Sequence, residues 1–451
     1  MNRFDITAFG AVGDGTTLNT AALRAAAEAC RDAGGGTVVV PPGTFLTGVF
    51  ELFGGTVLRV EKGGRLLASP RLEDHRVGDA SCGLLYARDA DGIVLTGEGT
   101  LDGNAGAFFV PGELHVPPEK PPPATWQARR GVPYGTARAD DGPIRSPGRP
   151  GNMLVFARCR NLRIESLTIT GAAYWTIHCA DCDGVEIDSV RIANDPRHPN
   201  NDGVHVTTCR AVRIARCAIS GGDDAVAITG FSDPGGEAEI ALGLSGRAGT
   251  CEDVEVSDCV LSSRSSAVRV GYGTNPVRRV RLRRLEIRDS NRGLCIHARQ
   301  SAVDDVTMES CRIETRLFHG NWWGRGEPVH LSTVRFAPEG RVFPIRDVVL
   351  TDVEADGEGP VVLFAEEAGA IERVALVRVR SRLRHGPLSD AWGGNLDLRP
   401  AADPALAIVS GGRAPLWAVG VAGLRCEECR WEADPDFSSD PVVLASFAGL
   451  A

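Results

Sequence analysis

In the stretch CEDVEVSDCVL, residues 251–261, Val254-Glu255-Val256 alternates apolar and polar side chains, and a Ser-Asp pair separates it from the apolar run Cys259-Val260-Leu261. Alternation with a period of two predicts short β-strands that bury one face. Strands of this length cannot bury an apolar face by themselves, so they need similar strands to stack against them. The rest of the chain should therefore contain related stretches.

The same pattern recurs along the chain, and no helical pattern separates the copies. Successive copies begin 23, 27, 42, 26, 26, 42 and 26 residues apart, and the two long steps contain loop-like insertions. A period of about 25 residues built from short strands is typical of a parallel β-helix, in which equivalent residues of successive coils stack in columns. The copies begin at Cys159, Cys182, Cys209, Cys251, Val277, Val303, Ile345 and Ile371.

This pattern predicts an all-β chain, with residues 1–451 forming a single parallel β-helix domain. About residues 1–45 are expected to form an N-terminal cap. Within the cap, the amphipathic stretch from Asn19 to Gly36 is predicted to be a helix that covers the open edge of the first coil.

Three segments fall outside the repeat and are predicted to be loops. The Pro-rich segment of about residues 110–150 lacks periodicity and is either a disordered linker or an ordered loop against the coil. Insertions at about residues 229–250 and 317–344 are expected to form active-site loops.

The composition excludes several classes of partner. A net charge of −9 argues against nucleic acid, because phosphate binding needs a basic surface. No run approaches the roughly 20 apolar residues of a membrane span. The basic residues are nearly all arginine, which favours local contacts with anions or sugars over a general basic face.

The cysteines and the first residues of the chain lead us to expect a reducing compartment. The stretch MNRFDITAFGAVGDG shows no leader pattern, so we expect a cytoplasmic protein whose thirteen cysteines stay reduced. Cys179/Cys182 and Cys426/Cys429 have zinc-ligand spacing. Several cysteines recur within the repeat, however, where thiols pack as small apolar groups, so we expect neither a metal nor another cofactor.

Two adjacent carboxylates, Asp223 and Asp224, stand directly before an apolar strand in GGDDAVAITG, residues 221–230. If residues 198–200 loop out of the preceding coil, Asp202 stacks beneath Asp224. Clustered carboxylates raise one another's pKa, so one stays protonated while its neighbours ionise. A protonated acid and a carboxylate that activates water are the two groups that glycosidic cleavage needs, and these residues could reach the spacing of an inverting enzyme.

These motifs resemble those of glycoside hydrolase family 28, the polygalacturonase-like enzymes, whose fold is a single-stranded right-handed parallel β-helix of the pectin-lyase-like class. Asn200-Asn201-Asp202-Gly203 looks like the family's Asn-Thr-Asp-Gly motif, and Gly222-Asp223-Asp224 looks like its Gly-Asp-Asp motif. The opening ITAFGAVGDGTTLNT and the stretch PPGTFLTG are also similar to the family. The resemblance implies that Asp223 is the general acid, that Asp202 and Asp224 activate the water, and that no metal is needed.

Two further family motifs differ in this chain. The family's Gly-His-Gly corresponds to Ser265-Ser266-Ala267, and its Arg-Ile-Lys, which holds the galacturonate carboxylate, corresponds to Cys295-Ile296-His297. Arg269 or Arg292 could supply the missing cation. The resemblance therefore implies an altered subsite, occupied by a neutral sugar or a rhamnose-containing pectic fragment.

Several residues complete the predicted substrate site. His205 should lie on the opposite strand face from Asp202, three residues earlier, and is either packed or a ligand. The Gly-rich loop HGNWWGRGEP contains two tryptophans suited to stacking on a sugar, with packing beneath the loop as the alternative. The predicted substrate-binding residues are Asn201, His205, His178, Arg269, Arg292, His297, Trp322, Trp323 and Glu327.

The leading hypothesis is an inverting glycoside hydrolase that acts from the ends of imported oligosaccharides, of rhamnogalacturonan or galacturonide type or another plant or microbial glycan. The first alternative is a β-helix polysaccharide lyase that uses arginine as base and usually binds calcium. The second is a non-catalytic carbohydrate-binding β-helix. The expected partner is an oligosaccharide, and the residues indicate no oligomeric state.

Overall fold

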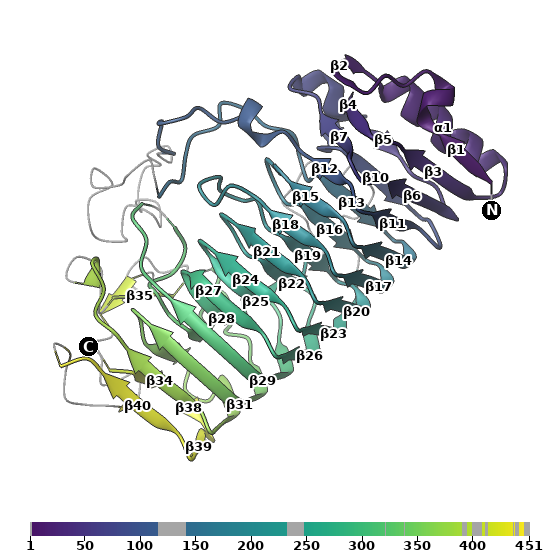
Figure 1. The fold of residues 1–451 in the computed structure, drawn as a ribbon. Helices are drawn as coiled ribbons and strands as arrows, with labels where there is room; N and C mark the ends of the chain where they lie inside the picture. Colours follow the sequence, from purple (N-terminus) through teal and green to yellow (C-terminus); the bar gives the residue numbers. More distant parts are fainter. Residues whose placement is uncertain are drawn as a thin grey trace.

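The computed structural model describes residues 2–115, 141–231, 248–320, 322–337, 339–389, 395–398, 408–410, 414–435, 437 and 442–445. The described residues form an elongated coil of short strands stacked side by side, with the helix α1 at its N-terminal end (Figure 1). The predicted fold class, a single-stranded right-handed parallel β-helix with an N-terminal capping helix, is confirmed.

One long sheet in the described part of the chain has 12 parallel strands. Each strand is hydrogen-bonded to the equivalent strand of the next coil. Its strands are β5 (Phe50–Glu51), β10 (Leu85–Arg88), β13 (Leu154–Ala157), β16 (Ile177–Ala180), β19 (Val204–Thr207), β22 (Val226–Gly230), β25 (Ser266–Gly273), β28 (Arg292–His297), β30 (Val329–Thr333), β32 (Val361–Ala365), β37 (Leu416–Val419) and β41 (Val442–Ala445).

The other long sheet has 25 strands and forms the remaining sides of the coil. They are β1 (Arg3–Asp5), β2 (Asp14–Leu18), β3 (Gly36–Val40), β4 (Gly43–Thr47), β6 (Thr56–Val60), β7 (Gly64–Ala68), β11 (Val94–Gly97), β12 (Thr100–Asp102), β14 (Arg160–Glu165), β15 (Thr168–Thr170), β17 (Asp183–Asp188), β18 (Arg191–Ala193), β20 (Arg210–Ala215), β21 (Ala218–Gly221), β23 (Cys251–Ser257), β24 (Val260–Ser263), β26 (Val277–Arg283), β27 (Glu286–Ser290), β29 (Val303–Thr315), β31 (Ile345–Gly357), β33 (Ile371–Val377), β34 (Arg380–Leu383), β38 (Val421–Ala422), β39 (Arg425–Glu427) and β40 (Arg430–Ala433).

The remaining elements are short. Two antiparallel pairs join β8 (Arg76–Val77) to β9 (Ala80–Ser81) and β35 (Asn395–Asp397) to β36 (Ile408–Ser410). The helix α1 spans Thr20–Asp32, and single 3-10 turns span Ile6–Phe9, Leu72–His75 and Ala105–Ala107.

The register of the coils follows the repeat read from the sequence. Cys251 pairs with Val277, Val277 with Val303, Val303 with Ile345, and Ile345 with Ile371. Because equivalent positions stack about 4.8 Å apart, each inward apolar side chain packs on the same position of the next coil. One such column, in which no side chain is more than 2% exposed, consists of Val212, Val254, Val280, Val306, Val348 and Val374.

The helix α1 closes the N-terminal end of this core. It presents Leu23, Ala26, Ala27 and Cys30, all fully buried, to the first coil. A parallel coil would otherwise expose unpaired backbone groups and apolar side chains at its end, so a cap is needed. None of the helices in the described ranges is long and apolar enough to cross a membrane.

Surface arginines form a ladder with carboxylates of neighbouring coils, which corrects the expectation that they face anions or sugars. At turn positions, Asp and Arg residues adopt left-handed backbone conformations with φ between 50° and 58°. There each guanidinium donates two hydrogen bonds to the carboxylate of the coil before it, as a fork-to-fork pair. These pairs are Asp89–Arg158, Asp253–Arg279, Asp258–Arg284, Asp347–Arg373 and Asp352–Arg378.

The predicted loops are described only in part. Most of the Pro-rich segment and most of the insertion at 229–250 lie outside the described residues, so those predictions stay open. The predicted loop at 317–344 is not one loop, because β30 interrupts it. All residues of β30, VHLST, are buried, and they supply a further strand to the 12-stranded sheet.

Candidate active site

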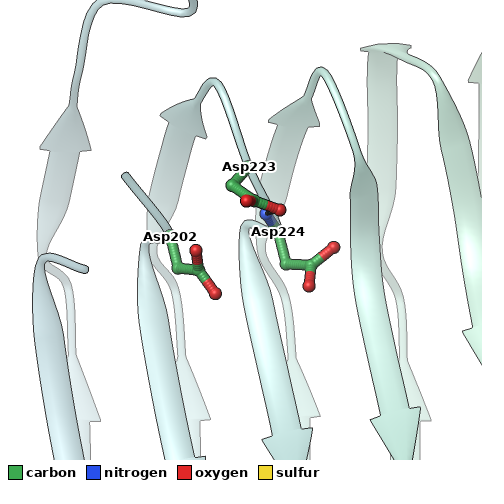
Figure 2. A group of neighbouring side chains, drawn as sticks. All are labelled: Asp202, Asp223 and Asp224. Atoms are coloured by element: carbon green, nitrogen blue, oxygen red, sulfur yellow. Dashed lines mark hydrogen bonds between the residues drawn. The ribbon is translucent and has the colours of Figure 1, made fainter. Parts of the chain in front are cut away.

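The three predicted carboxylates meet at one edge of the 12-stranded sheet. β19 and β22 pair with Val204 opposite Val226, and Asp202 and Asp224 each stand two residues before these positions. Figure 2 shows Asp202 on one coil and Asp223 with Asp224 on the next. One carboxylate oxygen of each residue lies within 4.8 Å of the others, and all three residues are buried. These nearest oxygens are closer together than the roughly 6.5–9.5 Å of an inverting pair, so the spacing expected from the sequence is not found between them.

A close approach of two loops holds these residues together. Gly222 lies directly under the preceding loop, where a Cβ atom would stand 2.1 Å from the carbonyl oxygen of His198. The Asn201 side chain accepts from the Gly222 N–H at 2.6 Å and donates to the Asp195 carbonyl at 2.9 Å. Asn201, predicted to bind substrate, is fully buried, and in the structure its side chain fixes the loop that carries Asp202.

Asp223 is a buried carboxyl group whose pKa is raised by its surroundings. Burial raises its pKa well above the usual range, and the negative charges of Asp202 and Asp224 raise it further. Its Oδ2 accepts a hydrogen bond from Asn200 Nδ2 at 3.2 Å, and its Oδ1 accepts from the Asp224 N–H at 2.9 Å. Asn200 in turn accepts from Arg149 at 2.7 Å, so an arginine is linked to Asp223 through one amide.

The side chain of His205 contacts the carboxyl group of Asp202. His205 Nδ1 lies 3.0 Å from Asp202 Oδ2, although the spacing predicted opposite faces. That prediction fails because Asp202 precedes β19 and does not follow its alternation. Burial and then Asp224 raise the pKa of Asp202 well above its usual range. Burial also lowers the pKa of His205, so the ring is neutral and can donate only one hydrogen bond.

Asp224 forms the ion pair of the cluster. Arg269, on β25, donates through Nε to Asp224 Oδ2, and its Nη2 lies 3.9 Å from Asp202 Oδ2. The Ser266 N–H donates to the other oxygen of Asp224 at 3.0 Å. Burial alone would lower the pKa of Arg269, but Asp224 and Asp202 overcome this effect and raise it. Arg269 therefore neutralises part of the cluster's charge.

A cavity of about 240 Å³ opens beside the carboxylates. Among the described residues, its lining begins at Asp223 and continues into coils nearer the C-terminus, and Asp202 is not part of it. It is lined by Asp223, Asp224, Phe231, Ser265, Ser266, Arg269, Tyr272, Arg292, His297, Arg299 and Trp323. A larger cavity of about 860 Å³ lies near the N-terminal cap, between residues such as Arg24, Glu51 and Tyr86, but none of its lining residues belongs to the carboxylate cluster.

Several predicted substrate ligands are engaged with the protein. His178 is fully buried, with its ring nitrogens 3.1 Å from Asn152 and 3.2 Å from Thr207, so it does not reach the cavity. Trp322 is 2% exposed, and its ring N–H donates to the Asp141 carbonyl. Trp322 therefore packs beneath the loop, which was the alternative to stacking on a sugar. Trp323 is half-buried and lines the cavity.

Glu327, predicted to bind substrate, contacts side chains of the protein in the structure. It is fully buried and receives Arg292 Nε at 3.3 Å and His330 Nδ1 at 3.3 Å. Burial would raise the pKa of Glu327, but the Arg292 guanidinium and His330 hold it well below its usual range. Arg292 lines the cavity, and the carboxylate of Glu327 neutralises its charge. The ring nitrogens of His297, which also lines the cavity, contact Ser332 and Cys295.

The sequence reasoning missed several residues around the carboxylates. Arg149 and Asn200 support Asp223, and Tyr272 and Arg299 line the cavity. Asn200 belongs to a motif that was recognised, so its place in that motif was a usable signal. Arg149 and Arg299 stand outside every repeat column, and no local pattern indicates them.

We predict that His205→Phe lowers kcat by about 10- to 100-fold while leaving KM nearly unchanged. Phenylalanine keeps the packing on Trp175, whose ring centroid lies 3.7 Å away, but it removes the hydrogen bond that orients Asp202. The matched control is His178→Phe, which loses two similar hydrogen bonds one coil away without touching a carboxylate. Equal loss of kcat in both variants would contradict a specific role for His205.

Comparison with known proteins identifies the family. The family model described as glycosyl hydrolases family 28 matches residues 84–312, which include all three carboxylates. The chain belongs to glycoside hydrolase family 28. It is therefore a member of a family of glycosidases, as the resemblance implied.

The family's relatives agree in sequence and in fold. The chain is 30% identical over 285 residues to a probable polygalacturonase of Arabidopsis thaliana (60% of this chain, 54% of the relative). It is 28% identical over 283 residues to an exopolygalacturonase of Zea mays (59% and 61%), so it spans just over half the length of these relatives. The structure resembles an exopolygalacturonase from Thermotoga maritima, with a TM-score of 0.63, 21% identity and coverage of 84% and 87%. A family 28 exopolygalacturonase of Yersinia enterocolitica gives a TM-score of 0.65 at 15% identity, covering 98% and 77%.

Proposed function

We propose that this family 28 protein hydrolyses a glycosidic bond in a pectic oligosaccharide with inversion at the anomeric carbon. The observation that carries the proposal is the set of three buried carboxylates from two adjacent coils. Burial and the charges of Asp202 and Asp224 raise the pKa of one of them, Asp223, well above its usual range. Protonated Asp223 donates its proton to the glycosidic oxygen, which leaves with the bonding electrons. A water molecule adds to the anomeric carbon from the opposite face.

The water is held between Asp202 and Asp224. Their nearest oxygens lie within 4.8 Å, and one water can bridge such a gap, because two hydrogen bonds of about 2.8 Å span it. Asp224, paired with Arg269, receives the proton from the water as the new C–O bond forms. His205 fixes Asp202, so the water keeps its direction of attack.

The shape of the cavity supports action from a chain end. On its N-terminal side, His178 and His205 are completely buried, and the Trp175 ring stacks on His205. A long polysaccharide running across the carboxylates would have to pass this covered side. The products should therefore be a single short sugar released stepwise, whereas a ladder of random internal fragments would contradict exo action.

Arg269 supports catalysis without metal. Three carboxylate oxygens within 4.8 Å could hold a divalent cation, but the Arg269 guanidinium already supplies a positive charge against two of them. The same ion pair, which raises the pKa of Arg269, makes this arginine a poor base for a lyase. We therefore expect neither calcium dependence nor an unsaturated product.

The test is turnover of pectic oligosaccharides, followed by reducing ends, by ultraviolet absorbance and by proton NMR of the first product. Reducing ends should appear without absorbance, EDTA should change the rate less than twofold, and the product should first appear with the inverted anomeric configuration. Retained configuration would contradict direct attack by water. An absorbing product lost with EDTA would indicate a lyase.

We also propose a cytoplasmic location, where the substrate would be an imported fragment. All thirteen cysteines lie in the described residues and are free thiols, and eleven of them are buried. Free thiols persist in reducing compartments. Fractionation of the source cells tests this location, and recovery of the protein in the culture medium would overturn it.

A further inference from the structure

Cys426 and Cys429 are the two accessible cysteines of the chain. They stand at one corner of the last coil, in the sequence Cys-Glu-Glu-Cys. Of the thirteen free thiols, Cys426 is exposed and Cys429 is half-buried, whereas the other eleven are buried. A reagent in solution can therefore reach these two thiols without opening the fold.

Both cysteines occupy positions that point into the core in the coil before them. Cys426 pairs with Leu376, and Cys429 follows Cys426 by three residues, as Val379 follows Leu376. Leu376 and Val379 are each 1% exposed. Glu428 has a left-handed φ of 53°, as do the residues at the equivalent corners of the two preceding coils, at 50° and 54°. The corner therefore keeps its shape and turns both cysteine side chains toward the core.

The two thiols lie close together across this corner. Cys429 Sγ is 3.2 Å from the carbonyl oxygen of Leu376, the residue on which Cys426 stacks. The two side chains are within hydrogen-bonding reach, and burial together with the neighbouring Cys429 raises the pKa of Cys426. Neighbouring sulfur atoms are what a disulfide requires.

The corner lies at the end of the coil, opposite the helix α1 (Figure 1). Here β39 and β40 pair with β33 and β34 on one side, and no described strand pairs with their other side. Inner coils are held by hydrogen bonds to a coil on each side, but this coil is held on one side within the described residues. A covalent link at the corner would restrain it further.

A zinc site does not account for the pair, although its spacing is that of zinc ligands. Structural zinc takes four ligands. In the part of the chain that the structure describes, the one group of three or more possible ligands is Asp202, Asp223 and Asp224, which does not include a cysteine. Two adjacent accessible thiols without further ligands favour thiol–disulfide exchange.

We propose that Cys426 and Cys429 form a modification site that low-molecular-weight disulfides, such as oxidised glutathione, convert into an intrachain disulfide closing the corner between β39 and β40. The thiolate of one cysteine attacks a sulfur of the reagent, which forms a mixed disulfide and releases one thiol. The other cysteine then attacks the bonded sulfur of the first and displaces the second thiol. The dithiol loses two electrons and two protons, and the reagent takes them up as it becomes two thiols. This site is independent of the proposed hydrolytic activity.

The test incubates the folded protein with oxidised glutathione at mildly alkaline pH and measures the intact mass and the linked peptides by mass spectrometry. The wild-type chain should lose two hydrogen atoms, and the linked peptides should join Cys426 to Cys429. Cys429→Ser should retain one glutathione on Cys426, because the displacing thiol is gone. Cys426→Ser should react at least about tenfold more slowly than wild type, since Cys429 is half-buried.

The matched control is Cys311→Ser, which changes a buried corner cysteine of an earlier coil and should leave closure unchanged. Glutathione that stays on the wild-type chain, a disulfide between other cysteines, or an unchanged mass would overturn the inference.

Hydrogen exchange tests the effect of closure on the last coil. Oxidation should slow exchange of the backbone amides of β39 and β40 at least about twofold and leave those of β19 and β22 unchanged, because a link at the corner opposes local opening. Reduction with dithiothreitol should reverse the change. Equal exchange of β39 and β40 in the two forms would overturn the restraint that we assign to the disulfide.

Discussion

Asp223→Asn should lower kcat by about 10²- to 10⁴-fold, the range that a general acid contributes. Asparagine has nearly the same shape, so it keeps the packing but offers no transferable proton. The measurement is reducing-end release at saturating substrate, beside the wild-type chain. Substrates with very acidic leaving groups need little protonation, so they should lose much less of their rate. A uniform loss for good and poor leaving groups would contradict the acid role.

The same substitution should stabilise the protein at neutral pH. The raised pKa of Asp223 means that the folded state binds its proton more tightly than the unfolded state. The stability that this carboxyl contributes is complete below its unfolded value of about 4 and declines as pH rises toward the folded value. Asp223→Asn should therefore raise Tm at pH 7, and the difference should vanish near pH 4.

Asp195→Asn provides a control of opposite sign. Burial would raise the pKa of Asp195, but hydrogen bonds from Arg197 hold this pKa below its usual range. Its contribution to stability is present above the unfolded pKa and is lost as pH falls through the folded one. The variant should lower Tm at pH 7 and have little effect at low pH. The same sign for both variants would contradict the assigned pKa directions.

Arg269→Met should lower the free energy of unfolding at pH 7 by about 3–5 kcal/mol, because it leaves buried carboxylates without a cation. The side chains of Asp202 and Asp224 are each 2% exposed, so water cannot replace the guanidinium. The loss should shrink as pH falls, since the buried carboxyls take up protons. Chemical denaturation at pH 7 and pH 5 measures both effects.

A double-mutant cycle separates the ion pair from packing. Arg269→Met with Asp224→Asn should recover a large part of the stability, because the charge left unpaired is removed. Arg284→Met breaks an exposed pair and should cost no more than about 1 kcal/mol. If Arg269→Met costs no more than Arg284→Met, the ion pair with Asp224 is not the feature that stabilises the cluster.

The repeat could be predicted from the sequence because the burial that produces it recurs in every coil. Each coil must bury alternate residues against the next, so the apolar column from Val212 to Val374 appears at fixed offsets in the sequence. Asp224 follows Cys209 by 15 residues, whereas Asp202 follows Cys182 by 20, so the prediction needed extra residues to loop out before Asp202. Both aspartates stand two residues before paired positions of β19 and β22. The register of the strands therefore allowed the position of the carboxylates to be predicted from the fold.

The side chains that contact those carboxylates could not be predicted from the repeat. His205 was expected on the opposite face from Asp202, and it bonds Asp202 because the chain before β19 leaves the strand geometry. Asn201, Glu327 and Trp322 carry groups typical of sugar binding, yet their bonds lie within the protein. Composition and spacing do not reveal which polar groups are already satisfied.

The residue pattern of the chain predicts the coil, its register, the capping helix and the meeting of Asp202, Asp223 and Asp224, because stacking forces equivalent residues into columns. The distribution of charge around these carboxylates follows instead from tertiary contacts. These contacts pair Arg269 with Asp224 and Arg292 with Glu327, and they leave Arg299 at the cavity without a described carboxylate. These outcomes depend on side-chain reach and burial between loops of different coils, which have no period and leave no pattern in the chain.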